Sequence, residues 1–204
     1  MGEPFRTTRR GLEIRLSEEE RDLLANLFGQ LDELLDDGRP VSDDPFDELA
    51  ALSGLSGLSG LGDLGGPDAA EPPSPPDDPA LARLLPEANR DDPEAAAEFR
   101  RLTEQGLRAR KRAGARLAAD VLRREGTPTL GDEETQTLLK ALTDLRLVLG
   151  ERLGLKTDED AARLGAQLAF GVEPYPGWRP LAATYELLQY LQESLVQALM
   201  SKRR

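Results

Sequence analysis

The C-terminal stretch from Pro180 to Met200 carries the clearest hydrophobic pattern in the chain. Its apolar residues share one arc at helical spacing: Leu181, Tyr185, Leu188, Leu195 and Leu199. Its polar residues form a stripe on the opposite side: Glu186, Gln189, Glu193 and Gln197. Since Leu187, Leu191, Val196, Ala198 and Met200 widen the apolar face, the pattern predicts a core helix with neighbours on several sides.

Gln192 interrupts this apolar arc. A buried amide without hydrogen-bond partners costs about 1–3 kcal/mol, so the side chain should bond to a neighbouring element. Asp144 borders the apolar stripe of another predicted helix and is one candidate partner. Gln192 and Asp144 are therefore expected to belong to a structural polar core.

Helical periodicity recurs in four further stretches, each with its own start and stop signals. The starts are a capping box of Ser17 and Glu20, a cap with a first-turn proline at Asp78-Pro79 and at Asp92-Pro93, and three acidic residues from Asp132. The expected stops are Gly38, Pro86, Gly126 and Gly154. A smaller helix is expected from Asp158 to Phe170, opened by Thr157 and Asp160 and closed by Gly171, and a short one after Asp44-Pro45.

The N-terminus has a different period. Leu12, Ile14 and Leu16 alternate with polar residues, and Arg9-Arg10-Gly11 separates this run from Phe5–Thr8. This alternation predicts a β-hairpin whose apolar face lies on the helices.

The middle of the chain predicts no packed structure. Residues 53–78 are rich in glycine, serine, proline and aspartate, which cannot bury enough surface to offset the entropy of ordering. We interpret them as a disordered linker, with a segment that folds on contact with a partner as the alternative. The predicted fold is mainly α: one helical-bundle domain with an N-terminal hairpin and first helix (1–52), the linker (53–78) and the remaining helices (79–204).

The helix between Asp92 and Gly126 is expected to bury an apolar stripe of Ala95, Phe99, Leu102, Ala109, Ala113 and Leu117. Its outer face would then be basic: Arg100, Arg101, Arg108, Arg110, Lys111, Arg112, Arg116, Arg123 and Arg124. Two interpretations stay open. The face is either a solvated surface that meets the acidic linker, or a docking patch for an acidic protein or a phosphate backbone.

The composition excludes several classes of partner and of catalytic site. The 204 residues carry a formal net charge of −12, which argues against direct DNA binding and against an anionic membrane as the main partner. The absence of cysteine and histidine excludes disulfides, Ser-His-Asp catalysis and most metal sites. A carboxylate-bound metal among Asp132, Glu133, Glu134 and the acids near Asp158 is the only enzymatic option, and helix capping already explains these residues. We therefore expect no catalytic site and no cofactor, and a cytoplasmic location because no signal peptide or spanning segment is evident.

Several stretches together resemble a known family. They are Leu12 to Asp36, Leu81 to Thr103, Thr143 to Gly150 and Tyr185 to Met200. They are similar to the actinobacterial family of AosR-type oxidative-stress transcriptional regulators, long catalogued as a domain of unknown function and often encoded beside the ClpS adaptor. The family's thiol switch cannot be carried over, because this chain has no cysteine.

The resemblance implies a non-enzymatic regulator that binds an alternative sigma factor or RNA polymerase in oxidative-stress or cysteine-biosynthesis control. The expected contact is the basic face, and its central residues are Arg100, Arg101, Arg108, Arg110, Lys111 and Arg112. The alternative is an adaptor associated with ClpS and Clp proteolysis. A homodimer is compatible with either function.

Overall fold

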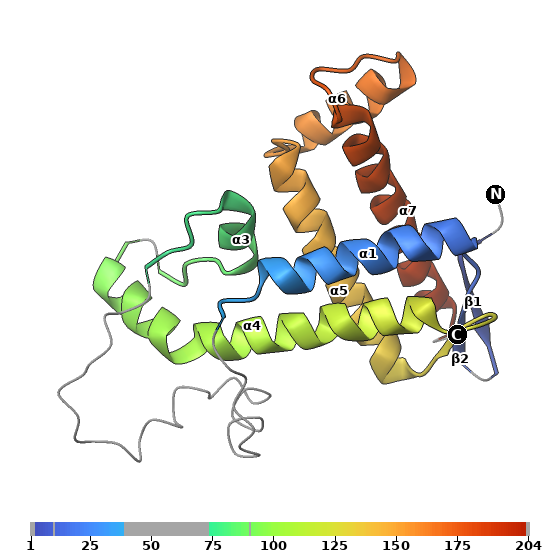
Figure 1. Ribbon diagram of the computed structural model, residues 1–204, viewed down its shortest axis with the longest axis horizontal. Coiled ribbons are helices and arrows are strands. Elements are labelled where there is room, and N and C mark those ends of the chain that lie inside the picture. Colours follow the sequence, from blue (N-terminus) through green and yellow to red (C-terminus); the bar gives the residue numbers. More distant parts are fainter. Residues whose placement is uncertain (1–2, 10, 39–73, 90, 203–204) are drawn as a thin grey trace. The chain divides into compact units, whose positions relative to one another are not determined.

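The computed structural model describes residues 3–9, 11–38, 74–89 and 91–202 (Figure 1). This part of the chain contains six helices and three short strands. The strands are β1 (Phe5–Thr8), β2 (Gly11–Ile14) and β3 (Thr129–Leu130). The helices are α1 (Glu18–Leu34), α3 (Pro79–Leu84), α4 (Pro93–Arg123), α5 (Asp132–Arg152), α6 (Asp158–Ala169) and α7 (Trp178–Lys202).

The predicted mainly helical fold with an N-terminal hairpin is therefore confirmed. The helix expected after Asp44-Pro45, and the predicted linker as far as residue 73, lie outside the described residues. No helix in the described ranges has the length and apolar character needed to cross a membrane.

The chain forms two compact units. Unit 1 comprises residues 1–31 and 114–204, and unit 2 comprises residues 32–113. The boundary falls inside α1 and again inside α4, so each of these helices contributes to both units. The expected domain limits at residues 52 and 79 stay a prediction.

A three-stranded antiparallel sheet in the order β1-β2-β3 belongs to unit 1. The predicted hairpin supplies its first two strands, and the third strand comes from the connection between α4 and α5. Leu12 and Ile14 are buried, as their alternation predicts. Strand β1 is also tied to α7, because Thr7 Oγ1 donates to the carbonyl oxygen of Ala198 at 2.9 Å.

Gly11 makes the approach of the third strand possible. Its φ of +135° lies outside the range that L side chains readily adopt. A Cβ at this position would lie 2.2 Å from the carbonyl oxygen of Leu130 in β3. The glycine is therefore required both by its backbone conformation and by the close approach of β3.

The predicted helix caps form as expected. Glu20 N donates to Ser17 Oγ at 3.2 Å and Ser17 N donates to Glu20 Oε2 at 2.8 Å, which completes the capping box of α1. Thr157 and Asp160 repeat this arrangement at α6. Asp78 and Asp92 cap α3 and α4 through their carboxylates. Gly126, Gly154 and Gly171 all have positive φ, in agreement with the expected stops.

Helix α7 is the core helix of unit 1, and it packs against α5, α6 and β1. It begins at Trp178, two residues before the predicted start, and Pro180 lies in its first turn. Its buried side is centred on Leu188, Leu191 and Leu195. Val196 and Met200, expected in the apolar arc, are exposed because no described neighbour covers that side of the helix.

Gln192 is a half-buried residue of α7 that faces α5. Its amide nitrogen donates to Thr143 Oγ1 at 2.9 Å, so the partner is the residue that precedes the expected Asp144. Asp144 itself is buried, as a polar core residue should be. Gln192 Oε1 is shielded from solvent and accepts no hydrogen bond from the described residues, which leaves the amide only partly satisfied.

Substitution of Gly11 by alanine tests the role of the close approach. We expect Gly11→Ala to lower the free energy of unfolding by at least about 2 kcal/mol, because the new Cβ would force β2 and β3 apart at a strained φ. Gly29→Ala is the matched control. Gly29 lies inside α1 with open space around it, so alanine there should stabilise by about 0.5–1 kcal/mol. Urea denaturation of both variants provides the measurement, and equal losses would contradict this account of Gly11.

Substitution of Gln192 tests the junction of α5 and α7. Gln192→Ala should lower the free energy of unfolding by about 1–2 kcal/mol, because it removes the bond to Thr143 and opens a small void. Gln189→Ala is the control on the same helix, since among the described residues Gln189 bonds only to Glu193, and it should cost no more than about 0.5 kcal/mol. Coincident urea midpoints for the two variants would show that Gln192 contributes nothing to the packing.

Candidate functional site

The arginines of α4 in unit 2 are the sequence-predicted site, and the structure orients them differently from the prediction. Arg100 is only 8% exposed, whereas Phe99 is 52% exposed and Ala95 and Ala113 are also exposed. The expected apolar stripe is therefore wrong in this unit, and Arg100 does not lie on an outer face. Arginine can pack its aliphatic stem inward provided that its guanidinium finds a carboxylate.

A ladder of ion pairs provides these carboxylates. Arg100 lies 3.4 Å from Glu87, on the connection before α4, and 3.4 Å from Glu104, one turn further along the helix. Glu104 also pairs with Arg108, one turn beyond, at 2.7 Å. The side chains of Arg100, Glu104 and Arg108 are almost buried, so the ladder lies on the packed side of α4.

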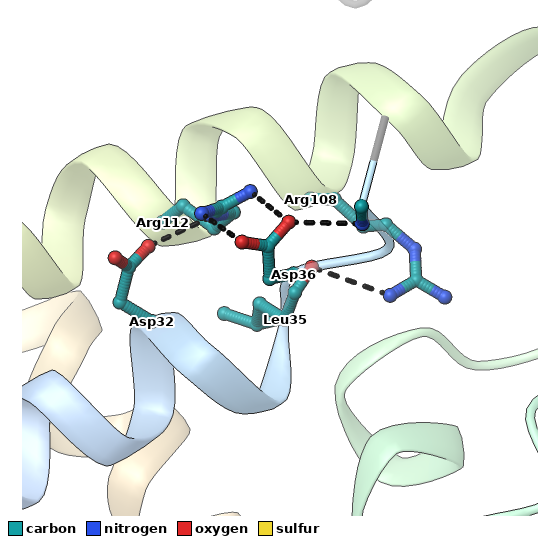
Figure 2. Close-up of polar contacts among 6 residues, drawn as sticks. Asp32, Leu35, Asp36, Arg108 and Arg112 are labelled. Carbon is teal, nitrogen blue, oxygen red and sulfur yellow. Dashed lines mark hydrogen bonds and ion pairs between the residues drawn. The ribbon is translucent and has the colours of Figure 1, made fainter. Parts of the chain in front are cut away.

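Arg112 makes the strongest contact, with the C-terminal end of α1 (Figure 2). Its Nε donates to Asp32 Oδ1 at 2.8 Å, and its two terminal nitrogens donate to the two oxygens of Asp36 at 2.7 and 2.9 Å. Bidentate pairing of this kind is the most favourable geometry for arginine and carboxylate. The hydrogen bond that Arg112 donates to Asp32 is the main reason why the pKa of Arg112 is raised, so its positive charge persists at any physiological pH.

The same contact closes the end of α1. Arg108 Nη1 donates to the carbonyl oxygen of Leu35 at 3.4 Å, which is one of the carbonyls that a helix end leaves without an intrahelical partner. Asp36 Oδ1 accepts a further hydrogen bond from the backbone nitrogen of Gly38 at 3.0 Å (Figure 2). Arg108 and Arg112 therefore hold the end of α1 within unit 2.

The other predicted site residues remain at the surface. Arg101 is exposed and pairs with Glu98, which lies in the preceding turn, at 2.7 Å. Arg110 is exposed and Lys111 is half-buried. The structure thus separates the six central residues of the predicted patch into an inward group of Arg100, Arg108 and Arg112 and an outward group of Arg101, Arg110 and Lys111.

The remaining residues of the predicted basic face, Arg116, Arg123 and Arg124, belong to unit 1. Arg124 pairs with Glu134 at 2.6 Å, and Arg123 lies 4.0 Å from Asp120. Arg21 of α1 donates to the carbonyl oxygens of Arg124 and Gly126, which follow the C-terminus of α4. These contacts are typical of helix ends.

Sequence reasoning missed the acidic partners. Asp32 and Asp36 were not expected to contact α4, because they lie 80 and 76 residues before Arg112. Glu87 is only 13 residues from Arg100, but it lies outside every predicted helix. One signal was nevertheless available: Arg100, Glu104 and Arg108 are spaced four residues apart, and this alternation of charge is typical of paired side chains on one helix face.

The acidic cluster considered as a metal site has a structural role. Glu134 accepts hydrogen bonds from Arg124 and from the backbone nitrogen of Gly131, and these bonds lower its pKa. Across the described ranges, no three carboxylates come close enough together to hold a metal ion.

The different roles of the inward and outward arginines can be measured as stability. Arg112→Ala should lower the free energy of unfolding by about 1–2 kcal/mol, because it removes three charge-assisted hydrogen bonds and leaves Asp32 in a largely buried position. Arg101→Ala, which removes an exposed pair from the same helix, should leave the urea midpoint unchanged. Equal midpoints for the two variants would contradict the assignment of Arg112 to the packed face.

Comparison with known proteins identifies the family of the chain. The model of the domain of unknown function DUF2017 matches residues 2–199, nearly the full length of the chain. Searches of curated proteins and of solved structures return no match. Because the match extends over both units, the chain belongs to the DUF2017 family.

Proposed function

We propose that this protein is a non-enzymatic transcriptional regulator that binds an alternative sigma factor or RNA polymerase. The processes under its control would be the oxidative-stress response or cysteine biosynthesis. The observation that carries the proposal is the resemblance of four stretches, in the same order along the chain, to the AosR-type regulators. Membership of a domain family that extends from residue 2 to 199 is in keeping with this resemblance.

The proposed electrostatic contact is the outward group of α4. Arg101 and Arg110 are exposed and Lys111 is half-buried, so an acidic partner could approach them, whereas the side chains of Arg100, Arg108 and Arg112 are largely buried beside carboxylates of unit 2. Substituting one of the inward arginines would destabilise unit 2, so a loss of binding in such a variant would not report on a contact with the partner. The partner-binding role is therefore proposed for the outward group alone.

The signal cannot be the oxidation of a thiol of this chain, because its sequence has no cysteine. The adaptor function in Clp proteolysis predicts a different set of partners. Identification of the proteins that co-purify with the chain therefore distinguishes the two functions.

Affinity purification with the tagged full-length chain tests the proposal. The unmodified protein should retain a sigma factor or polymerase subunits from lysate, identified by mass spectrometry. Reversing Arg101, Arg110 and Lys111 to glutamate together should reduce this recovery by about tenfold or more, since like charges would then oppose the acidic partner.

The matched control reverses three exposed basic residues of unit 1, Arg15, Arg123 and Arg163, and so changes the net charge by the same amount. It should retain the partner, and circular dichroism should show unchanged helicity in both variants. Recovery of Clp subunits in place of polymerase would support the adaptor function. An equal loss in the control would show that net charge, and not the outward group, governs binding.

A further inference from the structure

The two helices that carry the chain between the units each contain a glycine at the crossing. The chain passes from unit 1 to unit 2 after Leu31, inside α1, and returns to unit 1 after Ala113, inside α4. Gly29 lies two residues before the end of the first segment of unit 1, and Gly114 is the first residue of its second segment. Both crossings are therefore made by helix, next to a glycine.

The packing requires neither glycine. A Cβ at Gly29 would meet nothing within 4 Å, and a Cβ at Gly114 would meet only Thr137 Cγ2, at the ordinary van der Waals distance of 3.7 Å. Neither residue has a positive φ, so alanine could adopt the same backbone. Glycine is about fivefold less favourable than alanine inside a helix. The two glycines thus weaken α1 and α4 at the crossings, although alanine would fit at both.

Hydrogen bonds join α1 to α4 on both sides of these glycines. In unit 2, Arg112 of α4 bonds to Asp32 at 2.8 Å and to Asp36 at 2.7 and 2.9 Å. In unit 1, Arg21 of α1 donates to the carbonyl oxygens of Arg124 and Gly126, at 2.8 and 3.2 Å. The earlier residue of α1 contacts the later residue of α4, so the two helices are antiparallel and are tied together at each end of the glycine-containing stretch.

The register of the helix pair places the two glycines at one level. Gly29 and Gly114 lie three and two residues from the ion pair of Asp32 with Arg112. Counted from the contact of Arg21 with Arg124, they lie eight and ten residues away. With a rise of about 1.5 Å per residue, both counts place the glycines within about one helical turn of each other along the helix axes. Two side-by-side helices can bend together only if both yield at the same level.

We propose that Gly29 and Gly114 form a hinge at which unit 2 changes its orientation relative to unit 1. Helices bend at glycine because no side chain restricts φ and ψ there, and hinges consist of a few such residues. Since the bonds of Arg112 and Arg21 keep α1 and α4 together on either side, the bend is confined to the stretch between them.

The hinge has a consequence for binding. The outward group of Arg101, Arg110 and Lys111 belongs to unit 2, so the hinge would move it relative to every surface of unit 1. A partner that contacts both units would select one orientation. The inference goes beyond the proposed function and does not depend on the identity of the partner.

Double electron–electron resonance on the full-length chain tests the hinge. The chain has no cysteine, so Gln105→Cys in unit 2 and Gln197→Cys in unit 1 introduce one spin-label site in each unit at an exposed position. We expect a broader distance distribution for this pair than for a reference pair within unit 1, Gln136→Cys with Gln197→Cys. Gly29→Ala and Gly114→Ala together should each disfavour the bent forms by about fivefold and narrow the distribution toward the width of the reference pair.

Gly165→Ala is the matched control, because Gly165 lies inside α6 with open space around it and away from both crossings. It should leave the distribution between the units unchanged. The proposal would be overturned by a distribution as narrow as that of the reference pair in the unmodified chain, by an unchanged width in the double alanine variant, or by equal narrowing in Gly165→Ala. Loss of helicity by circular dichroism in the double variant would also contradict it, since the glycines would then be required for packing. None of these outcomes bears on the transcriptional function, which depends on the identity of the partner.

Discussion

The need to neutralise buried arginine charges governs the structure of unit 2. An uncompensated guanidinium on the packed side of a helix costs several kcal/mol, so each inward arginine of α4 requires a carboxylate at bonding distance. Glu87, Glu104, Asp32 and Asp36 meet this requirement for Arg100, Arg108 and Arg112. The pairing fixes which side of α4 faces inward. It also holds the end of α1, and it leaves Phe99 and the outward basic residues at the surface.

Features set by a few consecutive residues could be predicted from the sequence. The capping boxes of Ser17 with Glu20 and of Thr157 with Asp160 depend only on residues three positions apart. The stops at Gly126, Gly154 and Gly171 follow from the tolerance of glycine for positive φ. The hairpin follows from strict alternation. These signals are local, so no knowledge of the tertiary packing is needed to interpret them.

Features set by partners distant in the sequence could not be predicted in the same way. Both sides of α4 offer apolar surface, from alanines on one side and from the aliphatic stems of arginines on the other. The carboxylates at the end of α1 and Glu87 determine which of the two sides packs inward. The sequence pointed to Asp144 as the partner of Gln192, but the partner is the preceding residue, Thr143. The spacing of residues along α5 does not decide which of these two neighbours faces Gln192. Likewise, Phe170 has the composition of a core residue, and its exposure depends on where the chain turns after Gly171.

The central claim is that the arginines of α4 divide into a structural group and a surface group. A double-mutant cycle between Arg112→Ala and Asp36→Ala tests it most directly, because the cycle isolates the energy of the pair from the other effects of each substitution. The bidentate geometry predicts a coupling free energy of at least about 1 kcal/mol in urea denaturation. A coupling energy indistinguishable from zero would mean that Arg112 does not hold the end of α1 and remains available to a partner.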